Sequence, residues 1–382
     1  MRLAILGTRG VPPEYGGFET FAAELGSRLA RRGHSVTVYC RETRLPGGQV
    51  AGLSKIAGPP GNSATRQPDH WHGIRRIVLP HFPGKYFETV THTMLSALDA
   101  LRRDFDVILL CNAANAFTIP LLRVGRMPVA INVDGIERKR RKWNVFGQAF
   151  YATGEAFAAT FASAVVADAD VIADYYRANY SVEPVVIPYG AEFPAEEDTD
   201  VRQRLGIEKY ILYVSRFEPE NNPLEVVLAY EKLKDAPPLV MLGAARYDKA
   251  LEAELRRHAS PKIIFPGGLY GADYRTLQRR ALVYIQATEV GGTHPALIEA
   301  MASGGLVLAN DTPENREVGG DAIRYFQLQP RETLSGTLRE CLASGDQDGA
   351  WRERARRRAS ERFGWEAVTD AYEMLLTGLV RH

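Results

Sequence analysis

The sequence has little cysteine and no long apolar segment. Cys40, Cys111 and Cys341 are odd in number, far apart, and outside any Cys-x-x-Cys pair. This is not the pattern of a disulfide framework, and a reducing cytoplasm is its simplest interpretation. No stretch approaches the roughly 18 apolar residues that span a bilayer, and the apolar opening LAILG is too short for a secretory signal. We therefore expect a cytoplasmic protein, either soluble or peripheral at the inner face of the plasma membrane.

An excess of one charge sign is also missing, because the formal net charge is only +1. Residues 1–188 contain 22 Lys and Arg against 16 Asp and Glu, whereas the rest of the chain contains 25 against 30. A basic first half suits an anionic partner, and an ordinary solvated surface explains the difference equally well. The first glycine-rich loop has no G-x-G-x-x-G fingerprint, which argues against a dehydrogenase.

The sequence does have a regular alternation of short apolar strands and amphipathic helices. At 382 residues it is too long for one ordinary core, so two domains are expected, with a linker in the Glu-, Asp- and Pro-rich segment 192–200. The alternation predicts an α/β fold of two Rossmann-like, doubly wound parallel sheets that face a central cleft. Ligands in such folds bind at the carboxyl ends of the strands, so the cleft is the expected active site. The predicted strands are residues 3–6, 35–40, 74–79, 107–111, 129–133, 165–167, 210–214, 239–242, 263–265, 282–286 and 306–309, and the main predicted helices are residues 18–32, 86–103, 145–161, 170–179, 224–233, 249–258, 274–279 and one that begins near residue 295.

The most informative segment reads EVGGTHPALIEAMASG and follows a predicted strand. Gly291 and Gly292 allow the backbone to approach a ligand, Thr293 can cap the helix, and Pro295 suits its first turn. The unpaired amides and the helix dipole at this end favour an anion. We therefore predict a phosphate site here, and His294 is a further candidate for binding the ligand.

Four segments resemble a known family in the same order along the chain. They are GTRGVPPEYGGFET (7–20), VDGIERKRRKW (133–143), SRFEPENNPLE (215–225) and VGGTHPALIEAM (290–301). Together they resemble the retaining GT-B glycosyltransferases of glycosyltransferase family 4, which use nucleotide sugars, and among them most the bacterial polysaccharide rhamnosyltransferases. The resemblance covers essentially the whole chain. It implies an acceptor-side domain at 1–188, a nucleotide-sugar-binding domain at 189–364, and a last helix at 365–382 that crosses back to the first domain.

The resemblance assigns donor binding to the second half. Arg216 corresponds to the arginine that the family directs at the donor diphosphate, and a surface ion pair with Glu218 or Glu220 is the alternative. The lysine that the family usually has five residues later is Asn221 here, so one positive charge is missing. Thr293 and the neighbouring amides would then carry more of the diphosphate charge.

Glu299 corresponds to the family carboxylate that accepts hydrogen bonds from the ribose hydroxyls of the nucleotide, and an ordinary helix-surface glutamate is the alternative. The family's first glutamate, which contacts the transferred sugar, would stand eight residues earlier, where this chain has Gly291. Its absence favours a 6-deoxysugar such as rhamnose, because that sugar lacks the hydroxyl that needs a polar partner.

The loop before the first predicted helix is expected to form the other wall of the cleft. Gly16 and Gly17 can make a nest of amides near the donor phosphate or the acceptor. Arg9, Glu14 and Tyr15 are candidates for binding the acceptor, although a tight strand-to-helix turn with Tyr15 packed on it is an alternative.

Asp134 and Arg216 are the predicted catalytic residues. Asp134 directly follows a predicted strand, where it could orient the acceptor hydroxyl or stabilise an oxocarbenium-like transition state. A simple Asp-Gly turn with Gly135 is the alternative.

The run RKRRKW, residues 138–143, is the most basic stretch of the chain. We expect Arg138 and its neighbours to bind an undecaprenyl-diphosphate-linked acceptor or the anionic membrane surface, and a solvated helix start is equally compatible. A role in nucleic-acid binding is not expected. The histidines are too scattered to predict a metal site.

These observations favour a retaining transferase that moves a hexosyl or 6-deoxyhexosyl group, best L-rhamnose from dTDP-rhamnose, to a saccharide or lipid-linked saccharide in cell-surface polysaccharide synthesis. The nucleotide sugar would be a substrate, and no cofactor or metal is expected. A GT-B nucleotide-sugar epimerase and a transferase that uses UDP- or GDP-hexose are the alternatives.

Overall fold

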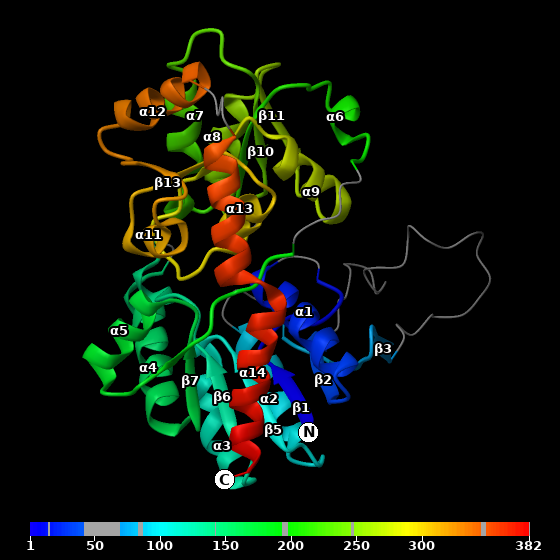
Figure 1. Ribbon diagram of the computed structural model, residues 1–382. Coiled ribbons are helices and arrows are strands. Elements are labelled where there is room, and N and C mark those ends of the chain that lie inside the picture. Colours follow the sequence, from blue (N-terminus) through cyan, green and yellow to red (C-terminus); the bar gives the residue numbers. More distant parts are fainter. Residues whose placement is uncertain are drawn as a thin grey trace, which may run out of the picture.

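Two α/β halves lie one above the other, and each contains its own sheet (Figure 1). The structure is a computed structural model that describes residues 1–13, 16–41, 69–82, 87–141, 143–192, 198–245, 248–344 and 349–381. Glu14 and Tyr15, predicted to bind the acceptor, lie outside the described residues, as does most of the predicted linker.

The sheet of the first half has the strand order β3-β4-β2-β1-β5-β6-β7-β8 over the described residues. Neighbouring strands are parallel except for the hairpin β3–β4. The central strand β5 is an unbroken apolar run that is buried at every position, because helices cover both faces of the sheet. The strands are β1 (Arg2–Leu6), β2 (Ser35–Arg41), β3 (His70–Trp71), β4 (Ile74–Leu79), β5 (Val107–Cys111), β6 (Val129–Asn132), β7 (Ala164–Ala167) and β8 (Val185–Val186).

The helices of the first half connect these strands. Phe21, Leu25 and Leu29 form the buried stripe of α1, as the spacing of apolar residues predicts. The helices are α1 (Gly17–Arg31), α2 (Phe87–Ala100), α3 (Ile119–Val124), α4 (Val145–Phe161) and α5 (Asp170–Tyr180), with short 3₁₀ helices η1 (Ala113–Thr118) and η2 (Glu137–Lys139).

The second half repeats the plan with a parallel sheet in the order β11-β10-β9-β12-β13-β14. Its strands are β9 (Ile211–Val214), β10 (Leu239–Leu242), β11 (Ile263–Gly267), β12 (Val283–Gln286), β13 (Val307–Asn310) and β14 (Arg324–Phe326). Its helices are α6 (Val201–Arg204), α7 (Pro223–Tyr230), α8 (Lys249–Arg257), α9 (Gly271–Arg280), α10 (Pro295–Ala302), α11 (Pro313–Gly319) and α12 (Glu332–Ser344), with the 3₁₀ helix η3 (Pro219–Asn221).

The predicted fold class is confirmed. Predicted strands and helices recur with bounds shifted by only a few residues, because a buried face fixes the period of each segment. The alternation does not predict the short antiparallel strand β3, nor the helices α11 and α12.

The last two helices join the halves. α13 (Ala350–Phe363) runs along the second half, and α14 (Trp365–Val380) continues down the first half beside α1 (Figure 1). Trp365 and Tyr372 of α14 pack on Phe21 of α1, with ring centroids 6.4 and 5.2 Å apart. At the junction the Ala191 amide donates to the Phe363 carbonyl at 2.7 Å, so the two segments that pass between the halves lie side by side.

Cys40, Cys111 and Cys341 are buried free thiols. Among the described residues, no helix combines the length and the apolarity that a membrane crossing requires.

Candidate active site

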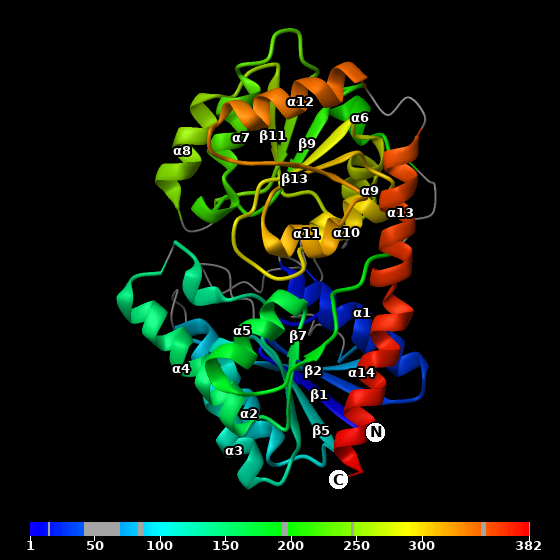
Figure 2. The ribbon, with the colours of Figure 1, turned by 60° about the vertical axis from the view of Figure 1, so that its left-hand side comes forward.

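A cleft of about 1040 Å³ lies between the halves and is lined from both of them. Helices α10 and α11 of the second half approach the first half at this boundary, opposite α1 and α5 (Figure 2). Residues just beyond the carboxyl ends of strands in both sheets line the cleft, and they include Gly7, Asn112, Asp134, Arg216, Gly243 and Thr288. The cleft therefore lies where the strand alternation predicts a ligand site.

Arg216 follows β9 and reaches the cleft with a guanidinium that is partly exposed. Its contact with Glu218 is long, at 3.8 Å, so the surface ion pair does not occupy it fully. The Asn221 side-chain Nδ2 donates to the Arg216 carbonyl at 2.7 Å, and the Tyr213 hydroxyl donates to the Asn221 backbone carbonyl at 2.6 Å. Asn221 also lines the cleft, so its side chain supports the loop that carries Arg216.

Arg140 is a second cation in the cleft lining, and it comes from the first half. Its guanidinium is buried, 2.7 Å from Glu137 and 3.5 and 3.6 Å from Glu218 and Glu220 of the second half. Burial favours the neutral form, but the surrounding carboxylates outweigh it and raise the pKa of Arg140 above its usual value. Arg140 is therefore a permanent positive charge that connects the two halves.

Arg138 does not line the cleft. Its guanidinium lies 3.4 Å from the buried Glu155 and donates to the Tyr175 hydroxyl. Arg141 is paired with Glu289 at 2.6 Å. Arg138, Arg140 and Arg141 thus face different carboxylates and do not form one exposed patch. The role of Arg138 in acceptor binding stays a prediction.

Glu299 lies on α10 and also lines the cleft. The Tyr274 hydroxyl donates to Glu299 Oε2 at 2.6 Å. Burial raises the pKa of Glu299 to about 7, although the bond from Tyr274 and the charge of Arg275 oppose the rise. This carboxyl group therefore changes its charge near neutral pH.

Gly291 and His294 form the turn that leads into α10. A Cβ atom at Gly291 would lie 2.2 Å from the His294 ring, so the imidazole occupies the space of a side chain at that position. Burial, with Arg140 and Arg216 nearby, lowers the pKa of His294 to about 3. His294 therefore reaches the cleft as a neutral imidazole, which can donate or accept a hydrogen bond.

Thr293 contacts the protein itself. Its amide donates to Asp168 Oδ2 at 2.7 Å, and its hydroxyl donates to the Asp168 carbonyl. The prediction that Thr293 caps α10 is wrong, because His294 is the N-cap residue and α10 has no side-chain cap. Both polar groups of Thr293 are engaged by Asp168, so its role in donor binding stays a prediction that requires these bonds to open.

Asp134 has a positive φ of 53° in its turn, and its backbone amide is held by Asn132 Oδ1 at 3.0 Å. Its carboxyl group lies near that of Asp168, and each acts on the pKa of the other. Burial raises the pKa of Asp134, although the positive charge of Arg140 opposes the rise. Asp134 thus lies in a turn and also lines the cleft. The two interpretations from sequence, an Asp-Gly turn and a carboxylate that acts on the acceptor, are therefore compatible.

The first loop meets α10 across the cleft. Gly16 is the N-cap residue of α1, and a Cβ atom at Gly17 would lie 3.5 Å from Pro295. Arg9 also lines the cleft, and its backbone amide donates to Glu19 Oε1 at 2.9 Å. The structure therefore brings the two predicted glycine-rich loops to the same end of α10.

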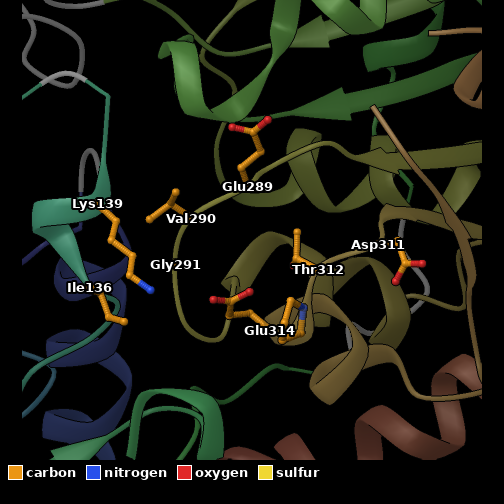
Figure 3. Close-up of a pocket in the computed structure, with 9 residues that line it drawn as sticks. Ile136, Lys139, Glu289, Val290, Gly291, Asp311, Thr312 and Glu314 are labelled. Atoms are coloured by element: carbon orange, nitrogen blue, oxygen red, sulfur yellow. The ribbon is translucent and has the colours of Figure 1, made fainter. Parts of the chain in front are cut away.

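A smaller cavity of about 310 Å³ lies behind the loop at Val290 and Gly291, which line both cavities. Figure 3 shows Ile136 and Lys139 of the first half on one side of it, with Glu289, Thr312 and Glu314 of the second half around the rest. The backbone at Gly291 therefore borders both cavities.

Asp168 and Tyr274 are not among the predicted site residues, and Arg140 was predicted only as a member of the basic run 138–143. Asp168 directly follows β7, as Asp134 nearly follows β6, so its place at a strand end was a usable signal. Arg140 is one of several similar cations in its run, and Tyr274 is one polar residue on an amphipathic helix. Neither of these two carries a distinguishing pattern.

Comparison with known families agrees with this arrangement. Residues 16–190 match the family model described as glycosyl transferase 4-like domain, and residues 196–358 match the one described as glycosyl transferases group 1. A search of curated protein sequences gave no match.

Solved structures share the fold across the whole chain. Sucrose-phosphate synthase from Thermosynechococcus elongatus is 19% identical with a TM-score of 0.81, and the match covers 99% of this chain and 98% of that one. Anabaena HepE in complex with UDP-glucose is 17% identical with a TM-score of 0.75, over 98% and 99% of the chains. A glycosyltransferase from Rickettsia africae is 16% identical with a TM-score of 0.73, over 100% and 99%. With a glycosyltransferase model matching each half and two parallel-sheet domains facing one cleft, the chain belongs to the glycosyltransferases of the GT-B fold.

Proposed function

We propose that this glycosyltransferase is a retaining enzyme that uses a nucleotide sugar. It transfers a hexosyl or 6-deoxyhexosyl group, with L-rhamnose from dTDP-rhamnose as the best candidate. The acceptor is a saccharide or a lipid-linked saccharide in cell-surface polysaccharide synthesis. The second half, residues 189–364, binds the donor, and the first half, residues 1–188, binds the acceptor.

One observation carries the proposal: Arg216, His294 and Glu299 line one cleft beside the start of α10. The guanidinium and the dipole of α10 can stabilise the charge that develops on a leaving diphosphate. Glu299, about one turn into the helix, can accept hydrogen bonds from the hydroxyls of the nucleotide's ribose or deoxyribose. A nucleoside diphosphate would meet these groups in this order, with its phosphates at the start of α10 and its sugar farther along the helix.

The bond changes are simple. The C1–O bond to the departing diphosphate breaks, the acceptor oxygen bonds to C1 on the same face, and the acceptor proton passes to the departing phosphate oxygen. Asp134 lies in the cleft from the opposite half, where it orients the acceptor hydroxyl. Retention follows because attack and departure share one face.

A 6-deoxysugar is favoured by the turn at Gly291. The His294 ring fills the space in which a side chain at position 291 would lie, so that position offers the sugar no carboxylate. A sugar without a 6-hydroxyl has one group fewer that needs a polar partner.

A UDP-hexose is the second candidate donor, because Anabaena HepE, a structural neighbour, was solved with UDP-glucose. Thermal-shift measurements with dTDP-rhamnose, UDP-glucose and GDP-mannose distinguish the candidates, since the true donor raises the melting temperature most. Arg216→Ala and Glu299→Ala should abolish the shift, whereas Asp134→Ala should keep it. The proposal is refuted if no nucleotide sugar and no nucleoside diphosphate shifts the parent protein.

A peripheral membrane contact, which a lipid-linked acceptor would require, is supported by α4 rather than by the basic run. Val145, Phe146 and Phe150 at the start of α4 are exposed, at 78%, 85% and 42%. Arg141, whose side chain is 59% exposed, lies just before them. Flotation with vesicles of anionic lipid tests the contact: Phe146→Ser with Phe150→Ser should lower the bound fraction, and Met374→Ser, at a position 78% exposed on α14, should not.

A further inference from the structure

Asp168 is a buried carboxyl group with one unsatisfied oxygen. It follows β7 directly and is 1% exposed. Oδ2 accepts the Thr293 amide at 2.7 Å, but Oδ1 has no hydrogen-bond donor among the described residues. A buried carboxylate oxygen without a donor is costly, so Oδ1 is expected to carry a proton of its own.

The group placed to accept that proton is Asp134, because each of the two carboxyl groups acts on the pKa of the other and their loops pack on the adjacent Gly291 and Gly292. Two buried carboxyl groups in contact cannot both be ionised. Burial, and then the charge of Asp134, raise the pKa of Asp168 well above its usual range. The proton therefore resides mainly on Asp168, and Asp134 accepts it with one oxygen.

The pair is pressed against the loop that leads into α10. A Cβ atom at Gly292 would lie 2.0 Å from Asp168 Oδ1, and one at Gly135 would lie 2.7 Å from Gly291. These contacts join loops of the two halves without room for a side chain. Asp134 reaches the cleft from this pair, whereas Asp168 stays behind it.

We propose that Asp168 is a positioning residue of the active site, which holds Asp134 through one shared proton and holds the loop before α10 through the Thr293 amide. The Asp168 carboxyl group then fixes the position of the Asp134 carboxylate in the first half and of helix α10 in the second half. One oxygen of Asp134 is occupied, so the other is the one offered to the acceptor. The effect on transfer rests on the proposed function, but the shared proton does not.

The pair lies among ionisable groups from several segments. Arg140, in the turn after η2, and Glu137, in η2, both act on the pKa of Asp134. The Cys111 thiol faces Asp134 from β5. Tyr189, in the segment after β8, and Tyr372, on α14, face both carboxyl groups. Arg140 alone among these carries a positive charge near neutral pH. It favours an ionised Asp134, which fits the proton residing on Asp168.

Infrared difference spectroscopy of the ligand-free protein at pH 7 tests the shared proton. The parent minus Asp168→Asn spectrum should contain the C=O stretching band of one protonated carboxyl group. This variant leaves Asp134 as a carboxylate with an amide donor beside it. Glu299 does not interfere, because its contribution cancels between parent and variant. Spectra without this band would overturn the shared proton, whatever reaction the enzyme catalyses.

Positioning is tested by comparing two substitutions. Asn at position 168 can still accept the Thr293 amide and donate to Asp134, whereas Ala can do neither. Asp168→Asn should keep the affinity for dTDP and kcat within about threefold, and Asp168→Ala should lower kcat by about tenfold or more. Glu155→Gln, which replaces a buried carboxyl group outside the cleft lining, reports the loss of stability without loss of kcat. If Asp168→Ala loses only stability, or if Asp168→Asn loses kcat equally, Asp168 does not position the site.

Discussion

Gly291 and Gly292, just before α10, are each in close contact with a side chain that needs the space a Cβ atom would occupy. Gly291 leaves space for the His294 ring, and Gly292 leaves space for the Asp168 carboxyl group. The ring is the end of a side chain and can move, whereas the carboxyl group is fixed by the Thr293 amide. A side chain at Gly292 is therefore expected to cost more than one at Gly291.

Gly292→Ala should lower the free energy of unfolding by about 1–3 kcal/mol, because the methyl group overpacks a buried contact. Thermal unfolding measures this loss. Gly336→Ala is the matched control: its Cβ would enter open space within α12, so this change should stabilise the protein by about 0.5–1 kcal/mol. Equal melting temperatures for the two variants would contradict the packing argument.

Glu299 predicts a pH dependence of nucleotide binding. Its pKa is raised to about 7, so the group is mostly protonated at pH 6 and mostly ionised at pH 8. The deoxyribose hydroxyl of dTDP donates to the ionised form, and the affinity for dTDP should rise with pH through 7, by at most about tenfold per pH unit. Titration calorimetry at pH 6, 7 and 8 measures this change. Glu299→Gln should bind more weakly at pH 8 and show little dependence on pH, and an unchanged slope in this variant would exclude Glu299 as the titrating group.

Helix α14 joins the halves through two kinds of contact with α1, and they are expected to differ in strength. Arg32 forms ion pairs with Glu366, Asp370 and Glu373, but the side chains of Glu366 and Asp370 are about two-thirds exposed. Trp365 is instead 5% exposed, packs on Phe21, and fits over Gly190, where a Cβ atom would lie 2.3 Å from the indole. Exposed ion pairs contribute little, whereas buried aromatic rings contribute strongly.

Trp365→Ala should therefore destabilise the protein by about 3–5 kcal/mol, and Arg32→Ala by about 1 kcal/mol or less. Differential scanning calorimetry in low and high salt separates the two effects, since only the ion pairs weaken with salt. A larger loss from Arg32→Ala would show that charge, not apolar packing, holds α14 in place.

At the scale of the whole molecule, Arg140 is a buried cation placed between the two halves. Its buried guanidinium faces Glu137 of its own half and Glu218 and Glu220 of the other. Removing one partner from a buried ionic cluster leaves the remaining charges poorly compensated. The cluster also lies beside Arg216 in the cleft lining, so its loss should reach the donor site.

Arg140→Met is expected to destabilise the protein by about 3–5 kcal/mol and to weaken dTDP binding, because the local charge becomes more negative. Thermal unfolding and calorimetry measure both effects. Arg177→Met, which removes an exposed cation paired with Asp174 and Glu183 on the first half, should change neither. If Arg140→Met lowers stability but leaves dTDP affinity intact, Arg140 joins the halves without contributing to the donor site.

The sequence predicted the fold from local patterns, and it predicted several residues of the site from their places at strand ends. The apolar runs at β5 and β9 and the buried stripe of α1 are visible in the chain itself, because the period of a strand or helix depends only on near neighbours. Arg216, Asp134 and the glycine loop at 291–292 were also predicted, since the carboxyl ends of parallel strands meet at one edge.

The partners of those residues were decided only by the tertiary structure. Nothing in the order of residues shows that Asp168 bonds to Thr293, 125 positions away, or that Arg140 turns inward while Arg138 faces Glu155. Such contacts depend on how the two halves pack against each other, and burial then sets the charges of Asp134, His294 and Glu299. The sequence by itself therefore determined which loops meet at the cleft. Packing across the cleft decided which polar groups are already engaged and which can bind a ligand, because desolvation and distance act only in the folded chain.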